Sequence, residues 1–192
     1  PVYDGFLDLL VATARALKVG DPTADGIALG PLANEKIYRN SEKQIADAVR
    51  RGAKVALGGE RLRGGAFEHG WFLPPTIIAD PDPAMLVMRE ETFGPVVGVM
   101  PFDSREEALR LANDSRYGLA GFVFCRDLAA ALNMAERIEA GSVWVNNIQR
   151  SHNNAPFGGM KESGIGREKG RYGVEAYLEY KTIYLSYQAG LG

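Results

Sequence analysis

Two adjacent glutamates, Glu90 and Glu91, stand just before an apolar segment that begins at Val96 and is predicted to be a strand. A carboxylate at the entrance to a buried strand can accept hydrogen bonds from a ribose diol, as acidic residues do in dinucleotide sites. In isolation, however, paired surface glutamates are more often simply solvated. From local sequence alone, a nucleotide site at Glu91, beside the aromatic ring of Phe93, is therefore one of two open interpretations.

A second group of candidate residues lies in a Gly- and Asn-rich segment, residues 146–167. Long irregular segments in compact domains are usually functional. The aromatic ring of Phe157 follows the amides of Asn146, Asn147 and Gln149, and aromatic rings with convergent amides line small-molecule pockets. The alternative is that Phe157 only anchors the loop on the core, and composition does not separate the two.

Other residues suited to chemistry are given structural interpretations. Cys125 lies where a predicted strand meets a predicted helix, and a helix N-terminus can lower a thiol pKa. Asp127 is expected to cap that helix, however, so a half-buried structural thiol is favoured. The glycines of residues 164–170 do not form a dinucleotide fingerprint, because the third is one residue late and no strand leads into them; turns and close packing are predicted instead.

Two further kinds of site are not expected. The histidines, His69 and His152, are far apart in the sequence, so no metal site is predicted. Ser151 and His152 are adjacent, which holds their side chains apart, and no nucleophile elbow is present.

Composition limits the class of protein. The chain has 192 residues, 22 Lys and Arg against 24 Asp and Glu, and 46% hydrophobic residues. This length allows one ordinary domain with a real core. A slightly acidic chain lacks the basic surface that grips phosphate backbones, and residues 95–102, the longest nearly apolar stretch, are too short to cross a bilayer. We therefore expect no nucleic-acid or membrane partner, and the single cysteine favours the reducing cytoplasm.

Helices and strands are predicted to alternate along the chain. Because the strands are apolar on both faces, we expect an α/β fold, a layered, mostly parallel sheet with helices on both faces. Helices are expected at 3–18, from Asn34 to Gly52, from Ser104, from Asp127 and at 168–177, and strands at 54–57, 71–78, 96–100, 119–124, 142–145 and 182–186.

Two of these elements raise questions of packing. The first helix is expected to carry one apolar stripe that includes Phe6 and Leu9. The strand at 182–186 has no sequential partner, and an unpaired edge invites pairing with another chain or domain.

Motifs in a fixed order resemble the aldehyde dehydrogenase superfamily over residues 3 to about 186. The motifs that carry the resemblance are Leu17–Pro22, Leu29–Leu32, Gly70–Thr76, Glu90–Val96, Asn113–Ala120, Gly141–Asn146, Pro156–Gly164 and Gly166–Glu168. The resemblance implies oxidation of an aldehyde to a carboxylic acid with NAD or NADP, through a thiohemiacetal and a thioester on a cysteine.

The resemblance also implies roles for particular residues. Glu91 matches the glutamate that binds the nicotinamide ribose, and Phe93 the phenylalanine that packs by the nicotinamide. Residues 146–157 match the substrate-entrance loop, so that the implied substrate contacts are Asn147, Gln149, Ser151 and Phe157. Residues 1–178 would be catalytic domain and residues 179–192 an oligomerisation arm, giving a homo-oligomer, a dimer or a tetramer.

The departures from the family are equally informative. The family's nucleophile lies in a Gly-Gln-x-Cys stretch, and neither that stretch, the general-base glutamate nor the dinucleotide-binding domain is found in this sequence. Cys125 falls at an ordinary strand end, so no catalytic residue is assigned. The chain, which starts at Pro1 and not at Met, is therefore expected to be a C-terminal portion that is inactive alone.

Several choices stay open at this point. The rival hypothesis is a non-catalytic truncated homologue that serves as an assembly or interaction module, docking through its terminal strand. The polar entrance loop favours a polar or acidic aldehyde, with Arg150 as a candidate carboxylate contact. The sequence does not decide which aldehyde is used, the choice between NAD and NADP, or whether coenzyme A takes part.

Overall fold

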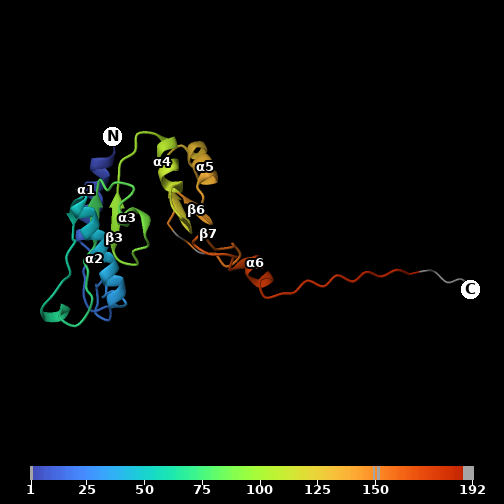
Figure 1. Ribbon diagram of the computed structural model, residues 1–192, viewed down its shortest axis with the longest axis horizontal. Coiled ribbons are helices and arrows are strands. Elements are labelled where there is room, and N and C mark those ends of the chain that lie inside the picture. The colour runs from blue at the N-terminus through green and yellow to red at the C-terminus, as the bar shows by residue number, and fades with distance from the viewer. Residues whose placement is uncertain (1, 149, 151, 188–192) are drawn as a thin grey trace, which may run out of the picture. The chain divides into compact units, whose positions relative to one another are not determined.

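The computed structural model describes residues 2–148, 150 and 152–187. The chain divides into two compact units, Pro1–Ser104 and Arg105–Gly192, whose elements are labelled in Figure 1. Each unit has its own helices and paired strands.

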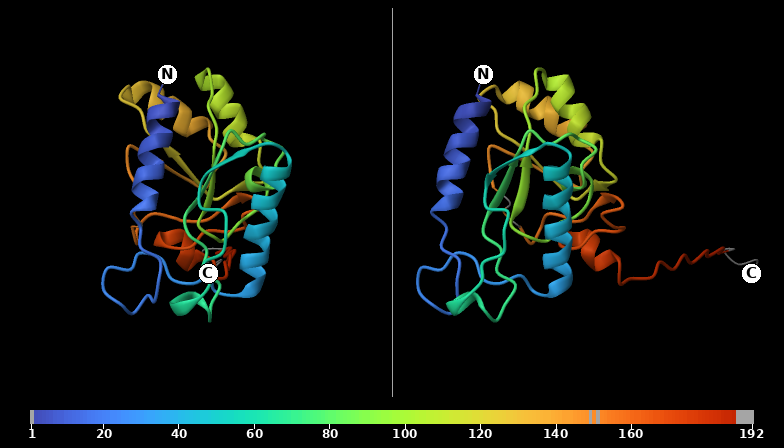
Figure 2. Two further views of the ribbon diagram at one scale, coloured as in Figure 1. Left: turned by 90° about the vertical axis from the view of Figure 1, so that its left-hand side faces the viewer. Right: turned by 60° about the vertical axis from the view of Figure 1, so that its left-hand side comes forward.

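A mixed three-stranded sheet organises the first unit. Its strands lie in the order β1-β2-β3, with β1 antiparallel and β3 parallel to β2. In both views of Figure 2, α1 and α2 stand on either side of these strands. The elements of this unit are α1 (Tyr3–Arg15), α2 (Glu35–Arg50), β1 (Lys54–Leu57), the 3-10 helix η1 (Gly65–Phe67), β2 (Thr76–Ala79), α3 (Leu86–Arg89) and β3 (Val96–Val99).

The α2 helix supplies one wall of the core. It begins where predicted, because Asn34 Oδ1 accepts a hydrogen bond of 3.0 Å from the backbone N–H of Ile37. Ile45 and Ala48 of α2 pack with Leu73, Ile78 and Met85, all buried.

An aromatic stack fixes the long connection between β1 and β2 to α2. The rings of Tyr38 and Trp71 are stacked with centroids 5.1 Å apart, and the Arg61 guanidinium lies 4.2 Å from the Trp71 centroid. Burial raises the pKa of the Tyr38 hydroxyl, and its hydrogen bond to Glu42 Oε1 raises that pKa further. The stack and the core therefore hold α2 as a rigid platform.

The second unit contains one parallel and one antiparallel pair of strands. β5 pairs in parallel with β6, α5 packs against both, and β4 pairs with β7. The predicted cap of α5 is confirmed, because Asp127 Oδ1 accepts from the N–H of Ala130. The elements of this unit are α4 (Arg105–Asn113), β4 (Tyr117–Gly118), β5 (Ala120–Val123), α5 (Leu128–Arg137), β6 (Ser142–Val145), β7 (Met160–Lys161) and α6 (Gly170–Glu175).

The predicted α/β class is confirmed, but some elements differ from expectation. The apolar residues of α1 were predicted to share one stripe, and burial along it is uneven: Phe6 is 56% and Leu9 71% exposed, whereas Leu10 and Ala14 are half-buried. The strand predicted at 71–78 is confined to β2, since Pro74 and Pro75 cannot donate to a ladder.

The C-terminal elements also differ. The helix predicted at 168–177 is the shorter α6, and residues 182–186 form no strand, because among the described residues nothing pairs with them. Within the same residues, no helix is both long and apolar enough to span a membrane.

Candidate functional site

The loop of residues 90–95, between α3 and β3, is bound to α2 by side-chain hydrogen bonds. The carbonyl oxygen of Glu91 accepts from Asn40 Nδ2 at 2.7 Å and from Gln44 Nε2 at 3.0 Å. The hydroxyl of Thr92 donates to Gln44 Oε1 at 2.7 Å. Gln44 is 1% exposed, so its two bonds form largely away from solvent, where polar groups need partners. The backbone of the loop is therefore fixed.

The same loop turns its chemically useful side chains outward. Glu91 is exposed, and the ring of Phe93 is 76% exposed. Phe93 has a φ of 53°, in the left-handed region that bulky residues avoid. A Cβ at Gly94 would overlap the hydroxyl oxygen of Ser41, so a larger residue there would displace the Ser41 side chain. The loop thus offers a carboxylate, which can accept from a diol, next to a flat apolar ring.

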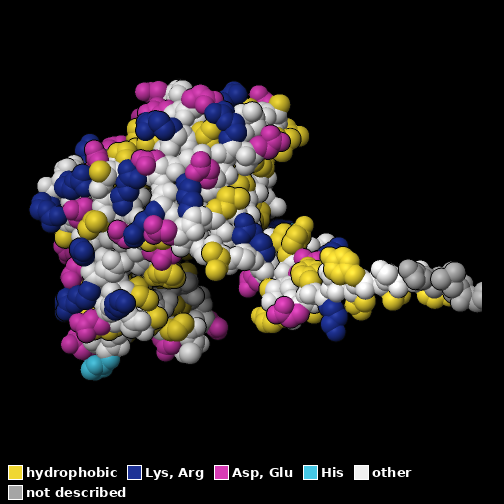
Figure 3. Space-filling view, turned by 45° about the vertical axis from the view of Figure 1, so that its right-hand side comes forward, with side chains coloured by type: hydrophobic (Ala, Val, Ile, Leu, Met, Phe, Trp, Pro, Cys, Tyr) yellow, Lys and Arg dark blue, Asp and Glu magenta, His cyan; other side chains and the backbone are white. Residues whose placement is uncertain are grey.

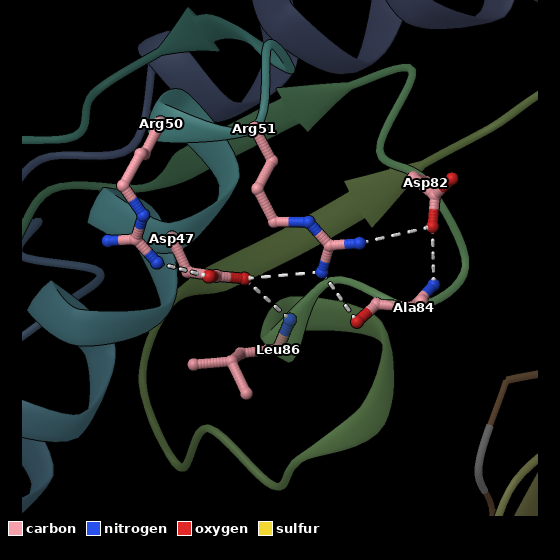
Figure 4. A network of polar contacts seen from close by, with 6 residues as sticks. All are labelled: Asp47, Arg50, Arg51, Asp82, Ala84 and Leu86. Atoms are coloured by element: carbon pink, nitrogen blue, oxygen red, sulfur yellow. Dashed lines mark hydrogen bonds and ion pairs between the residues drawn. The ribbon is translucent and has the colours of Figure 1, made fainter.

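A polar network holds the segment that leads into this loop, as Figure 4 shows. The buried carboxylate of Asp47, on α2, accepts from the backbone N–H of Leu86 at 3.0 Å and from Arg50 Nη2 at 2.6 Å. Arg51 lies 3.8 Å from the same carboxylate and donates to the carbonyl of Ala84 at 2.7 Å. The start of α3 is therefore tied to the end of α2.

In the second unit, Phe157 is one of the residues that line a cavity. A cavity of about 290 Å³ is lined by Ser142, Val143, Trp144, Arg150, His152, Ala155, Pro156, Phe157 and Lys169. Backbone hydrogen bonds in both directions join Phe157 to Glu168, at 2.9 and 2.8 Å. The Lys169 ammonium lies 5.2 Å from the Phe157 ring. Arg150 and His152 bring further basic groups to the same cavity.

Close backbone packing positions the Phe157 loop. A Cβ at Gly141, just before β6, would overlap the carbonyl oxygen of Gly158. The predicted turns in residues 164–170 are confirmed by φ values of 126° at Gly164 and 79° at Gly166. These glycines serve loop geometry, as their structural interpretation predicted.

Two side chains from the predicted loop form hydrogen bonds with main-chain groups. Asn146 Oδ1 accepts from the N–H of Cys125 at 2.9 Å, and its Nδ2 donates to the Cys125 carbonyl at 2.8 Å. The half-buried Cys125 thus lies between β5 and α5, where a strand and a helix were predicted to meet. Asn147 Oδ1 accepts from the N–H of Ile148, and Asn147 is not among the residues that line the cavity.

The remaining predicted contacts, Gln149 and Ser151, lie outside the described residues. Glu91 and Phe93 belong to the first unit and Phe157 to the second. No cluster of side chains suited to a metal ion occurs among the described residues. Sequence analysis missed Gln44; its signal was a polar residue on the same helical face as Ile45 and Ala48.

Comparisons with known proteins identify one family. Residues 1–183 match the model of the aldehyde dehydrogenase family. The chain is 43% identical over 178 residues to a chloroplastic betaine aldehyde dehydrogenase of Beta vulgaris, covering 93% of this chain and 35% of that protein. It is 42% identical over 184 residues to a glutarate-semialdehyde dehydrogenase of Pseudomonas aeruginosa, covering 96% and 37%.

A solved structure is similar over the same extent. Betaine aldehyde dehydrogenase from Staphylococcus aureus, in complex with NAD+, superimposes with a TM-score of 0.88 at 38% identity, over 92% of this chain and 35% of that one. The chain therefore spans about a third of the length of the curated relatives it matches.

Proposed function

The chain belongs to the aldehyde dehydrogenase family, and we propose that it supplies cofactor and substrate contacts to an enzyme that oxidises an aldehyde to a carboxylic acid with NAD or NADP. The observation that carries this proposal is the rigid loop that presents Glu91 and Phe93 to solvent. The family's Gly-Gln-x-Cys stretch is not in this sequence, so the thiol that forms the thioester is not assigned to this chain.

The loop fits the nicotinamide end of the cofactor. A carboxylate is a strong acceptor for two neighbouring hydroxyls, which suits Glu91 to the nicotinamide ribose. The exposed ring of Phe93 gives the nicotinamide a flat surface to pack on. When bound, the nicotinamide accepts a hydride; the residues of this chain bind and orient it. The NAD+ in the related solved structure supports the same cofactor here.

The basic groups of the second-unit cavity favour an acidic aldehyde. Arg150, His152 and Lys169 line it, and none of its described lining residues is an aspartate or glutamate. A carboxylate on the substrate would gain charge-assisted hydrogen bonds there, whereas a quaternary ammonium would be repelled. Relatives named for betaine aldehyde and for glutarate semialdehyde match this chain about equally well. The choice between these two substrates therefore rests on the charge of the cavity.

A panel of aldehydes tests this proposal in the native-length protein. We expect kcat/KM to be at least about tenfold higher for glutarate semialdehyde than for betaine aldehyde or hexanal, because hydrogen bonds to charged groups contribute about 1.5–3 kcal/mol. Replacing Arg150 with Gln should reduce that preference, and Arg150→Lys should retain part of it. A panel in which apolar aldehydes are the best substrates would contradict the assignment.

We also propose that residues 179–187 join copies of the chain into a dimer or tetramer. This segment is extended, and Figure 3 shows apolar side chains along it. Tyr180, Ile183, Tyr184 and Leu185 are each at least 80% exposed. An extended apolar segment with unpaired backbone groups gains hydrogen bonds and buried surface by joining a sheet of another copy.

Deleting residues 180–187 should therefore reduce the assembly to its monomer or to a smaller oligomer. Sedimentation velocity on the native-length protein measures this, and Ile183→Asp should act in the same direction. Ile183→Val, which keeps an apolar side chain at that position, is the matched control and should preserve the assembly. An unchanged mass after the longer deletion would contradict the role of this segment.

The competing proposal is a non-catalytic module that only assembles, favoured by the same exposed segment. Aldehyde-dependent NADH formation separates the two, because an assembly module would sediment as an oligomer without turnover. A cytoplasmic location, suggested by the single cysteine, completes the first proposal.

A further inference from the structure

The α2 helix carries a line of polar side chains on the face it turns toward the protein. Asn40, Ser41, Gln44 and Asp47 are spaced so that they share one side of a helix. Ser41, Gln44 and Asp47 are 0%, 1% and 7% exposed. Amphipathic helices normally bury apolar residues at such positions, and buried polar groups are costly unless they are paired. The placement of these four polar side chains on the inward face of α2 therefore calls for a structural or functional explanation.

Every member of this line contacts the segment of residues 86–94. Asn40 and Gln44 converge on the Glu91 carbonyl, and Asp47 holds the N–H of Leu86. The Ser41 hydroxyl lies where a Cβ on Gly94 would be. One face of α2 thus contacts the segment that leads into the loop, and the loop that presents Glu91 and Phe93.

Gln44 makes the most specific of these contacts. Its Nε2 donates to the carbonyl of Glu91, and its Oε1 accepts from the hydroxyl of Thr92. The two bonds, at 3.0 and 2.7 Å, fix two successive residues with a single buried amide. The amide group carries a donor and an acceptor on the same carbon, so one side chain makes both bonds at once.

The loop needs such a constraint because its local preferences oppose its shape. Phe93 adopts a positive φ with a ring that is 76% exposed, so neither packing nor intrinsic preference stabilises it. Strained residues of this kind persist where the surrounding structure over-determines them, and they cluster at functional sites. The bonds from Asn40 and Gln44 to the carbonyl of Glu91, two residues before Phe93, oppose relaxation of the loop.

We propose that Gln44 is a positioning residue, which holds the Glu91–Phe93 loop ready for the nicotinamide end of the cofactor. The proposal rests on the cofactor role of that loop given above. It assigns Gln44 no contact with the cofactor; the residue acts through the backbone of Glu91 and the hydroxyl of Thr92.

The test compares isosteric variants of the native-length protein. Gln44→Met keeps the volume but removes both hydrogen bonds, Thr92→Val removes one, and Thr92→Ser keeps the hydroxyl. Ile45→Val is the matched control, because Ile45 is the buried neighbour of Gln44 on α2 and packs in the core, away from the loop. Hydrogen exchange of residues 91–94 without cofactor, fluorescence binding of NADH and the melting temperature are measured for each.

For Gln44→Met, we expect exchange in residues 91–94 to accelerate about tenfold and NADH to bind about 3- to 10-fold more weakly, as loss of buried hydrogen bonds predicts. KM for NAD should rise while KM for the aldehyde stays unchanged. Thr92→Val should show a smaller change in the same direction, and Thr92→Ser should behave as the unaltered protein. Ile45→Val should lower the melting temperature without changing loop exchange or NADH affinity.

The two readouts separate failure of this proposal from failure of the proposed function. If residues 91–94 exchange hydrogen at the same rate in Gln44→Met as in Ile45→Val, the positioning role of Gln44 is overturned. If residues 91–94 exchange faster in Gln44→Met while NADH affinity is unchanged, the loop does not contact the cofactor. That result would also overturn the positioning role of Gln44. If the unaltered protein binds no NADH or NADPH, the proposed function fails, and the inference that rests on it fails with it.

Discussion

Replacing Glu91 with Gln is expected to lower kcat/KM for NAD by about 10- to 100-fold in the native-length protein, because hydrogen bonds to a charged acceptor contribute about 1.5–3 kcal/mol. The amide keeps the size of the side chain but loses the charge that binds a pair of hydroxyls. The fold should be unaffected, since Asn40 and Gln44 hold the main-chain carbonyl of Glu91 and not its side chain.

Steady-state and single-turnover rates measure this effect. A slower single turnover would indicate poor orientation of the nicotinamide, whereas a change confined to the steady state would indicate altered cofactor release. Glu90→Gln, at the neighbouring exposed carboxylate, is the matched control and should retain the rates of the unaltered protein. If Glu91→Gln leaves both rates unchanged, the carboxylate does not bind the ribose.

Replacing Gly141 with Ala is expected to raise KM for the aldehyde about tenfold or more and to destabilise the protein by about 1–3 kcal/mol, the usual cost of overpacking. The added Cβ would overlap the carbonyl oxygen of Gly158, and a main-chain atom cannot move aside by rotating a bond. The loop must therefore shift, together with the ring of Phe157, which lines the cavity.

This variant should leave NADH affinity nearly unchanged, because Asn40 and Gln44, which hold the Glu91 carbonyl, belong to the first unit. Gly5→Ala is a suitable control, since a Cβ at Gly5 on α1 meets no atom within 4 Å. Thermal unfolding and aldehyde saturation curves provide the measurement. A Gly141→Ala protein with normal stability and a normal aldehyde KM would contradict the packing account.

Local signals predicted the secondary structure well where their partners are also local. The caps at Asn34 and Asp127 were read correctly because each side chain bonds to an N–H three residues later. Where an element depends on distant partners, prediction failed. The stripe on α1 is only partly covered, with Phe6 and Leu9 exposed, and residues 182–186 alternate like a strand but have no described neighbour.

The candidate site shows the same division. Glu91, Phe93 and Phe157 were predicted as site residues because their motifs resemble those of a known family, not because local sequence was decisive. Asn147 was predicted as a substrate contact from its place in the resembled entrance loop, and its side-chain oxygen accepts a hydrogen bond from the next residue. Gln44 was missed because a glutamine between Lys43 and Ile45 resembles a surface residue until the helix is seen to bury it.

The most direct test of the central claim is aldehyde-dependent formation of NADH, followed by absorbance, for the native-length protein and for residues 1–192 alone. Our account predicts that the native-length protein forms NADH and carboxylic acid in equal amounts. It also predicts that the 192-residue chain forms neither, because the family's Gly-Gln-x-Cys stretch is not in its sequence. Turnover by the chain alone, or none by the native-length protein with any aldehyde and either NAD or NADP, would contradict it.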